Sequence, residues 1–196
     1  VGHIRDLPSK DGAVLPEDDF KMSWQMHKDK EKVIKEIMPD LKVITMPKNS
    51  TWRFKHLYVP TMCNHNDGVI VPQSISWIRS RFLNKSVRSP HRKLFIDRGV
   101  GSRKLSNKEE IFAILKGWEV LRLEEMSIVD QLTAFAEATH IVSPHGAGLT
   151  NLLWCEPGTK VIELTHEAFF GKKVYPVLSH HLGLKHTVLL LSLIHI

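Results

Sequence analysis

Cysteine is nearly absent from this chain, and long hydrophobic runs are missing. The 196 residues include only Cys63 and Cys155, which lie far apart and lack the paired spacing of a zinc site. The sequence therefore indicates neither a disulfide framework nor a metal cluster, and it leaves the redox compartment open. No apolar run is long enough to span a bilayer, and the first residues lack the charged-then-apolar order of a secretory signal.

Internal repeats and low-complexity tracts are absent too, and the composition that is present is that of a globular protein, with 42% hydrophobic and 24% charged residues. This length fits one medium domain, or one domain plus part of another. The net charge of +6 suits an anionic partner such as a nucleotide diphosphate, a nucleic acid or a membrane surface. Because the basic residues are scattered along the sequence, we expect no direct binding to nucleic acid.

The two ends of the chain are unusual. Val1 is not a start methionine, and the final Leu191-Ser192-Leu193-Ile194-His195-Ile196 follows an apolar run without a cap or a charged tail. Those six residues also correspond to the translated end of a transposon used to prepare sequencing libraries. We therefore predict a truncated chain in which residues 191–196 are a sequencing-adapter artefact. The untrimmed DNA of the source tests this, and a natural stop codon further on would contradict it.

The first part of the chain, residues 1–85, has an irregular pattern. Residues 1 to about 27 are polar and interrupted by proline and glycine, which predicts a loop. A helical pattern then runs from Lys28 to Pro39. Strands are expected at 41–46 and 55–59, and a helix is expected near 73–82.

The second part, residues 86–190, alternates regularly between strands and helices. Strands are expected at 93–97, 118–123, 140–143, 160–164 and 186–190, with helices starting at Asn107 and Ser127, a short helix ending at Leu153, and a helix over 173–181 interrupted at Pro176. This alternation predicts an α/β fold with a parallel sheet buried on both faces. Ligands of such sheets bind at the carboxyl ends of the strands.

The segment Ser143–Asn151 falls at such a strand end. Gly146 and Gly148 flank Ala147, and without a Cβ they let the backbone approach a ligand closely. The following helix presents N–H groups to a diphosphate, and His145 can donate a hydrogen bond to a phosphate or a sugar. The alternative is a tight turn whose glycines serve only packing.

Two further strand ends are expected at the same edge. Arg98 and Arg103 flank two glycines after the strand at 93–97, in a position to bind phosphate oxygens, although surface arginines solvating a loop would have the same sequence. Glu163 ends another strand, where a carboxylate can accept hydrogen bonds from ribose hydroxyls. Its alternative roles are a helix N-cap partner or an exposed ion pair.

These residues together resemble glycosyltransferase family 61. The matching segments are Ile96-Asp97-Arg98, Ser102-Arg103, Asn107 with Glu109 and Glu110, Gly117-Trp118-Glu119-Val120, Gln131, Pro144 to Asn151 with the sequence PHGAGLTN, and Pro157 to Leu164 with the sequence PGTKVIEL. The resemblance is dense over 93–164 and looser over 57–81. One departure is Arg103-Lys104-Leu105, where many relatives have a second arginine, so one phosphate contact is expected to be weaker.

The resemblance implies a two-lobed GT-B fold, with residues 1–85 as a partial N-terminal lobe and linker and residues 86–190 as a Rossmann-like lobe that binds a UDP-sugar. It implies inverting transfer of a sugar to a hydroxyl of a glycan or protein. Carried over to this sequence, the donor-site residues are Arg98, Arg103, His145, Gly146, Ala147, Gly148, Asn151 and Glu163. Localisation stays open: cytoplasmic or membrane-associated in a bacterium, and the lumen of the Golgi or endoplasmic reticulum in a eukaryote.

Inverting transfer also needs a base that deprotonates the acceptor and positive charge that stabilises the departing diphosphate. Arginines, His145 and a helix N-terminus meet the second need without a metal, so no metal or other cofactor is expected. The base is unassigned. His65 and Asp67 are candidates, although Asn66-Asp67-Gly68 is also ordinary turn chemistry. His180 and His181 are expected to be surface or interface residues.

Two other functions fit part of the pattern. One is a non-catalytic nucleotide-binding module, or a truncated enzyme that binds the donor without transferring it. The other is a Rossmann-type dehydrogenase domain, which is disfavoured because no full G-x-G-x-x-G follows a first strand and Asn151 stands where the third glycine is expected.

Overall fold

The computed structural model describes residues 4–6, 13–16, 39–46, 51–53, 72–83, 89–98 and 108–191. The chain divides into two compact units, Val1–Thr61 and Met62–Ile196. The boundary predicted at residue 85, as a division between enzyme lobes, stays a prediction. The helix expected over 28–38 and the strand expected over 55–59 lie outside the described residues.

The first unit contains two small parallel pairs of strands. β1 (Ile4–Asp6) pairs with β4 (Thr51–Arg53), and β2 (Ala13–Pro16) pairs with β3 (Val43–Met46). β3 confirms the strand expected at 41–46. The loop prediction for the first 27 residues was wrong over β1 and β2, because strands of three and four residues are too short to show an alternating pattern and depend on partners distant in sequence.

The second unit is built on a five-stranded sheet in which every neighbouring pair is parallel. Its strands are β5 (Arg92–Ile96), β6 (Glu119–Leu121), β7 (Ala138–Pro144), β8 (Lys160–Thr165) and β9 (Lys185–Leu190), in the spatial order β6-β5-β7-β8-β9. The α/β fold with a parallel, Rossmann-like sheet is thus confirmed. Since β6 lies on one side of β5 and the later strands on the other, the order reverses between β5 and β7, which makes this a topological switch point.

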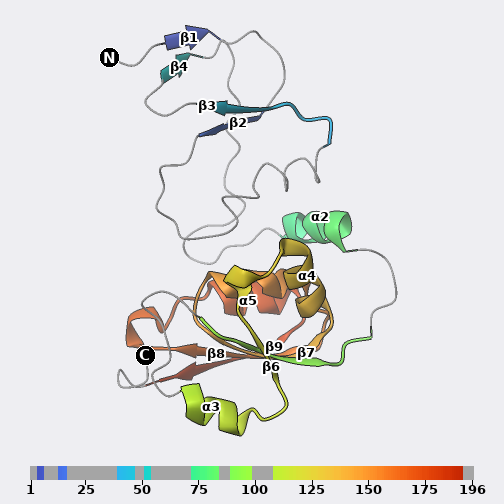
Figure 1. Cartoon of the computed structure of the whole chain (residues 1–196), viewed down its shortest axis with the longest axis vertical. Helices are drawn as coiled ribbons and strands as arrows, with labels where there is room; N and C mark the ends of the chain where they lie inside the picture. The colour runs from blue at the N-terminus through green and yellow to red at the C-terminus, as the bar shows by residue number, and fades with distance from the viewer. Residues whose placement is uncertain are drawn as a thin grey trace. The chain divides into compact units, whose positions relative to one another are not determined.

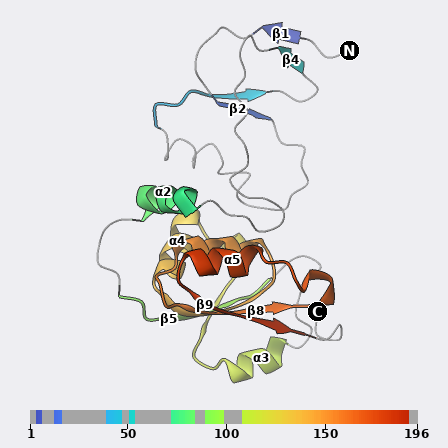
Figure 2. The same ribbon diagram turned by 180° about the vertical axis from the view of Figure 1, so that it is seen from behind.

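Helices cover both faces of this sheet, as Figures 1 and 2 show. α4 (Ile128–Ala136) and α5 (Val174–His181) lie on one face, and α3 (Lys108–Ile114) lies on the other. The 3₁₀ helix η2 (Ala147–Trp154) contacts both α4 and α5. This two-sided cover accounts for the continuous apolar runs in the central strands.

Two hydrophobic clusters fill the space between the helices and the sheet. The larger includes Leu94, Phe135, Ile141 and Leu149, on the α4 and α5 side. The smaller has Phe95, Val142 and Leu164 at its centre, with Phe112 of α3 against Phe95 in an edge-to-face ring contact at 5.4 Å between centroids. Alternate residues of β5, β7 and β8 thus enter opposite clusters, as the period of a strand requires.

Local sequence signals explain where the helices begin and end. The Ser127 hydroxyl accepts a hydrogen bond from the Asp130 N–H at 3.1 Å, which is the predicted cap of α4. Gly117 has a φ of 82°, the left-handed conformation expected after α3. The predicted interruption at Pro176 was wrong, because Pro176 falls in the first turn of α5, where a backbone N–H has no acceptor within the helix.

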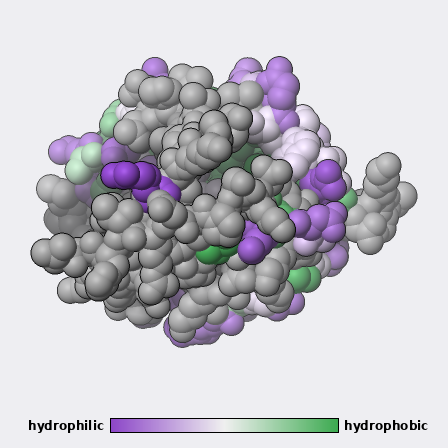
Figure 3. Space-filling model, turned by 90° about the horizontal axis from the view of Figure 1, so that it is seen from above, coloured by the Kyte–Doolittle hydropathy of each residue, from purple (hydrophilic) through white to green (hydrophobic). Residues whose placement is uncertain are grey.

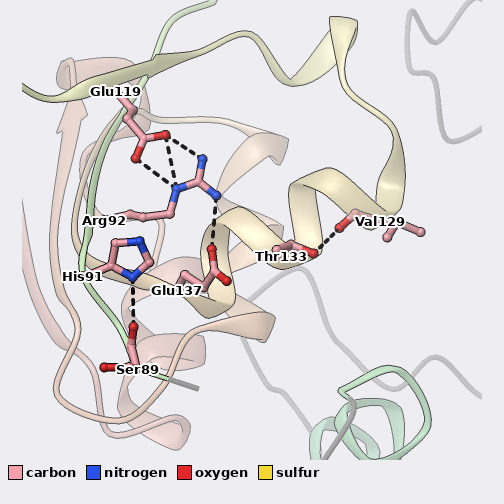
Figure 4. A network of polar contacts seen from close by, with 7 residues as sticks. All are labelled: Ser89, His91, Arg92, Glu119, Val129, Thr133 and Glu137. Atoms are coloured by element: carbon pink, nitrogen blue, oxygen red, sulfur yellow. Dashed lines mark hydrogen bonds and ion pairs between the residues drawn. The ribbon is translucent and has the colours of Figure 1, made fainter. Parts of the chain in front are cut away.

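A charged cluster joins three elements at the amino end of β5 (Figure 4). The Arg92 guanidinium donates to both carboxylate oxygens of Glu119, its closest contact being 2.6 Å, and it contacts Glu137 at 3.4 Å. The hydrogen bonds from Arg92 hold the pKa of Glu119 below its ordinary value. The starts of β5 and β6 and the end of α4 are therefore held together by one side chain.

α2 (Pro72–Phe82) confirms the helix expected at 73–82 and belongs to the second unit. Arg79 donates to the carbonyl oxygens of Leu153 and Cys155, the latter at 2.8 Å. The Phe82 and Trp154 rings meet edge to face at 5.6 Å between centroids. Because η2 ends near these acceptors, α2 supplies partners to carbonyls at a helix terminus.

Within the described residues, no helix combines the length and the apolarity needed to cross a bilayer. Figure 3 shows strongly hydrophilic residues interspersed with hydrophobic ones on the face seen from above, among the residues coloured there.

Candidate functional site

The carboxyl ends of β5 and β7 meet at the topological switch point, where open α/β sheets bind their ligands. Asp97 and Arg98 follow β5 directly, and His145 and Gly146 follow β7. The His145 N–H donates to the Leu164 carbonyl at 2.7 Å, so the β7–β8 pairing continues to the start of this loop.

Asp97 fixes the end of β5 against β6. Its carboxylate is buried, with 7% of the residue exposed, and it accepts a hydrogen bond from Arg122 Nε at 3.3 Å. Its N–H donates to the Leu121 carbonyl at 2.9 Å. Arg122 was not found from the sequence, and its only signal is a basic residue directly after a strand.

Arg98 connects the two loops at the switch point. Its Nη1 donates to the backbone carbonyl of His145 at 3.1 Å, and its side chain is half-buried. Two of the strand-end loops that the sequence predicts to converge therefore do meet, and a guanidinium lies beside the histidine.

His145 is held on several sides. Its ring stacks on Phe169, with 5.0 Å between centroids and 25° between planes, and meets Tyr175 edge to face at 5.4 Å. Its Nδ1 hydrogen-bonds to the carboxylate of Glu163. These contacts leave the ring little rotational freedom, since rotation would break the hydrogen bond and the stacking together.

Glu163 is buried, with 2% of the residue exposed, and both of its carboxylate oxygens are engaged. Oε1 accepts from His145, and Oε2 contacts Nε2 of His186 at 2.9 Å. The His186 Nδ1 in turn contacts the Ser179 hydroxyl at 2.7 Å. A buried polar chain thus runs from α5 through β9 and β8 to the loop after β7.

The ionisation of Glu163 follows from these contacts. Burial alone would raise the pKa of this carboxyl, but the hydrogen bonds from His145 and His186 outweigh it and hold the pKa below the ordinary value of 4.5. Glu163 is therefore a carboxylate at neutral pH. A buried charge within an apolar strand requires polar partners. The sequence predicts a strand at 186–190 but no role for His186, and the need of Glu163 for a partner was the one signal that pointed to it.

The small residues after His145 differ in their surroundings. Gly146 is buried, whereas Ala147 is exposed. A Cβ on Gly148 would come within 2.9 Å of Leu123 Cδ1 and 3.8 Å of Ile96 Cγ2. The missing side chain of Gly148 thus faces neighbouring apolar groups and permits close packing.

Asn151 has its side chain in contacts within the fold. Its Nδ2 donates to Gln131 Oε1 at 2.9 Å, and its Oδ1 accepts from Trp154 Nε1 at 3.2 Å. These bonds tie η2 to α4.

The remaining predicted site residues, Arg103, His65 and Asp67, lie outside the described residues. In the part of the chain that the structure describes, no three His, Cys, Asp or Glu side chains are arranged to hold a metal ion.

The sheet and the loops at its switch point define a Rossmann-like α/β protein. Residues 15–162 match the family Glycosyltransferase 61, and the chain therefore belongs to glycosyltransferase family 61. This confirms the family to which the sequence motifs pointed.

One relative is the beta-1,2-xylosyltransferase RCN11 of Oryza sativa subsp. japonica, which is 26% identical over 139 residues. That match covers 61% of this chain and 26% of the relative, so the chain spans about a quarter of that protein's length. DNA topoisomerase 1 of Zymomonas mobilis subsp. mobilis is 58% identical over 36 residues, which are 18% of this chain and 3% of that protein. A match of this size is about one βαβ unit long and supports no relationship in function.

Proposed function

We propose that this chain binds the diphosphate of a UDP-sugar at the carboxyl edge of β5 and β7, as the C-terminal lobe of a GT-B type inverting glycosyltransferase. The main support is the hydrogen bond from the Arg98 guanidinium to the His145 backbone carbonyl, which joins the residues that follow two neighbouring strands at the switch point. Membership of glycosyltransferase family 61 supports the same function independently.

The proposed chemistry places positive charge at the leaving diphosphate. Arg98 and Arg103 supply guanidinium groups and His145 an imidazole, which together stabilise the charge that develops on the departing UDP without a metal ion. The acceptor is a hydroxyl of a glycan or protein. His65 and Asp67 remain the proposed candidates for the base that deprotonates it.

The eight proposed donor-site residues divide by their surroundings. Direct contact with the donor is assigned to Arg98, Arg103, His145, Gly146 and Ala147. Gly148, Asn151 and Glu163 are assigned an indirect role, because the first packs against apolar side chains and the other two have their polar atoms bonded within the fold.

The first test is thermal stability in the presence of UDP. A ligand at about a hundred times its Kd stabilises a fold by roughly 2.7 kcal/mol, so UDP should raise the Tm by several degrees. His145→Ala and Arg103→Ala should each lose this response while keeping the basal Tm within a few degrees of the unmodified chain. His91→Ala is the matched control, because His91 is exposed at the amino end of β5 and its ring hydrogen-bonds only the Ser89 carbonyl among the described residues. A chain whose Tm ignores UDP would contradict the proposal.

A transfer assay separates an enzyme from a donor-binding module. The rice relative is named as a xylosyltransferase, so UDP-xylose is the first donor to test with glycan acceptors. Binding of UDP with transfer supports the proposal in full. Binding without transfer identifies a module that only holds the donor, and stabilisation by NAD in place of UDP would favour a dehydrogenase-like domain.

A further inference from the structure

The buried polar chain Ser179–His186–Glu163–His145 allows its protons to be assigned. A carboxylate only accepts hydrogen bonds, so the histidine nitrogens that face Glu163 must both carry hydrogen. With Nε2 of a neutral His186 protonated, its Nδ1 is an acceptor, and the Ser179 hydroxyl donates to it. Each of the three contacts among these four residues then pairs one donor with one acceptor.

The same reasoning fixes the tautomer of His145. Its Nδ1 carries the hydrogen that is donated to Glu163, so Nε2 of the neutral ring carries a lone pair. No described residue donates to or accepts from that Nε2 in a hydrogen bond. An unprotonated Nε2 cannot donate to a phosphate oxygen, and it gains that ability only by binding a second proton.

We propose that Glu163 is a positioning residue, which holds His145 in this tautomer and stabilises its imidazolium form, so that binding of a nucleoside diphosphate is coupled to uptake of one proton at His145 Nε2. This inference rests on the function proposed above. Ser179 and His186 act one step further away, by fixing the second oxygen of Glu163.

Some of the charged and titratable groups around His145 favour a positive charge on its ring, and others oppose it. Glu163 from β8 favours the protonated ring directly, and a bound diphosphate would add to this. Arg98 lies at the His145 carbonyl and Lys172 lies 4.9 Å from the centre of the Phe169 ring, so these two cations oppose a positive charge on the His145 ring. His166 contacts the same Phe169 ring. Tyr175 from α5 and Phe169 contribute ring contacts to His145. The opposing cations are the reason to expect protonation on binding rather than before it.

The experiment measures proton uptake when the full chain binds UDP. Calorimetric titrations at about pH 6 and pH 8, each in two buffers of different ionisation enthalpy, give the number of protons bound per UDP. UDP titrates in the same range, since the second pKa of a phosphate is about 6. His145→Gln therefore serves as the reference, because its proton uptake includes the protons that bind to UDP itself but none at residue 145.

We expect the unmodified chain to take up nearly one proton more than His145→Gln at the higher pH. Its affinity for UDP should fall by up to tenfold per pH unit over the range in which binding takes up this proton. Glu163→Gln should lose most of the extra proton and about tenfold in affinity, and Glu163→Asp, which retains the charge, should restore part of both. Equal proton uptake in the unmodified chain and His145→Gln would overturn the proposal.

Nitrogen NMR of the histidine rings in the free chain supplies a second measurement that needs no variant. The expected His145 signal at high pH is that of a neutral ring protonated at Nδ1 alone, and addition of UDP should protonate Nε2 as well. A free ring protonated at Nε2 overturns the role of Glu163, whatever UDP does. If UDP fails to bind, the proposed function and the coupling to it fail together, while the tautomer of the free ring still decides whether Glu163 positions His145.

Discussion

At the level of single residues, Glu163 makes the stability of the fold depend on pH. Its pKa is lowered in the folded chain, so its carboxylate stabilises the fold above the unfolded value near 4.5, and this contribution is lost as the pH falls through the folded value. Glu163→Gln should therefore lower the free energy of unfolding at pH 7 by about 1–3 kcal/mol, because histidine donors lose a charged acceptor.

The difference between Glu163→Gln and the unmodified chain should shrink as the pH falls below 4.5 and through the lowered pKa of folded Glu163, because both side chains are then neutral. Denaturant unfolding followed by circular dichroism at pH 7, 5 and 3.5 measures it. Glu125→Gln is the control, because the Glu125 side chain is 65% exposed. A difference that stays constant over this pH range would show that the carboxylate of Glu163 has no part in the effect.

Two threonines near the ends of β8 offer a matched test of buried hydroxyls. Thr165 Oγ1 is buried and has no hydrogen-bond partner within the described structure. Thr159 Oγ1 is also buried, but it donates toward the carbonyls of Ala138 at 3.0 Å and Glu156 at 2.8 Å. Thr165→Val should leave stability unchanged or raise it by up to about 1 kcal/mol, whereas Thr159→Val should lower it by about 1–2 kcal/mol.

Thermal unfolding of the two valine variants under identical conditions measures this difference. Equal losses from both substitutions would indicate that the Thr165 hydroxyl is satisfied in solution. Thr165 follows Leu164, whose carbonyl accepts a hydrogen bond from the His145 N–H. The change in Tm when UDP is added to Thr165→Val then shows whether the Thr165 hydroxyl contributes to UDP binding.

At the level of secondary-structure elements, Gly148 controls how closely η2 approaches Leu123. Gly148→Ala brings a Cβ within 2.9 Å of Leu123 Cδ1, so Leu123 must move, at a cost of about 1 kcal/mol. In a Leu123→Ala background the same substitution should be neutral or stabilising, because alanine favours helix over glycine. A double-mutant cycle in urea measures the coupling.

Gly117→Ala is the control for that cycle. Gly117 has open space around its missing Cβ but a φ of 82°, so its alanine variant is destabilised by backbone strain alone. This loss should be the same in the unmodified chain and in the Leu123→Ala background. If Gly148→Ala lowers the free energy of unfolding by the same amount with and without Leu123→Ala, the loss does not come from the packing of η2 against Leu123.

The elements of the second unit could be predicted from the sequence because the pattern of each is strong. β5, β7 and β8 are apolar runs bounded by turn residues, and α4 has a capping serine. One topological rule predicted that the loops carrying Arg98 and His145 meet, and they do, although their roles as donor-site residues stay a prediction. Glu163 was expected to face a ribose. The structure engages both of its oxygens with histidines, and its contact with a donor remains untested.

The contacts of Glu163 with His186 and of His186 with Ser179, which the sequence did not predict, depend on strand register and on the packing of α5. A single sequence does not reveal either. His186 pairs with Val161 in the β8–β9 ladder, two residues before Glu163 and on the same face of the sheet. Ser179 reaches His186 only because α5 folds back over β9. Neither contact has a signature in local composition, so both residues were missed as partners of the carboxylate.

At the level of the whole molecule, Cys155 reports how often the second unit opens. Its thiol is fully buried, and burial raises its pKa strongly, while Arg79 lowers it and Glu156 raises it. Since the thiolate is the reactive form, labelling requires opening of the hydrophobic cluster that Cys155 shares with Ile75 of α2, Leu152 and Leu178. In a Cys63→Ser background, the remaining thiol should therefore react far more slowly in buffer than in denaturant.

The same thiol then tests whether the proposed donor site and the core open together. If labelling proceeds through global unfolding, UDP at about a hundred times its Kd should slow it by about a hundredfold, because the unfolded population falls by the factor 1 + [UDP]/Kd. If α2 detaches alone, the thiol reacts at a rate that UDP leaves unchanged, since the β5–β7 loops stay folded. His145→Ala in the Cys63→Ser background should abolish any protection by UDP, and protection that persists there would mean that UDP stabilises the fold from another surface.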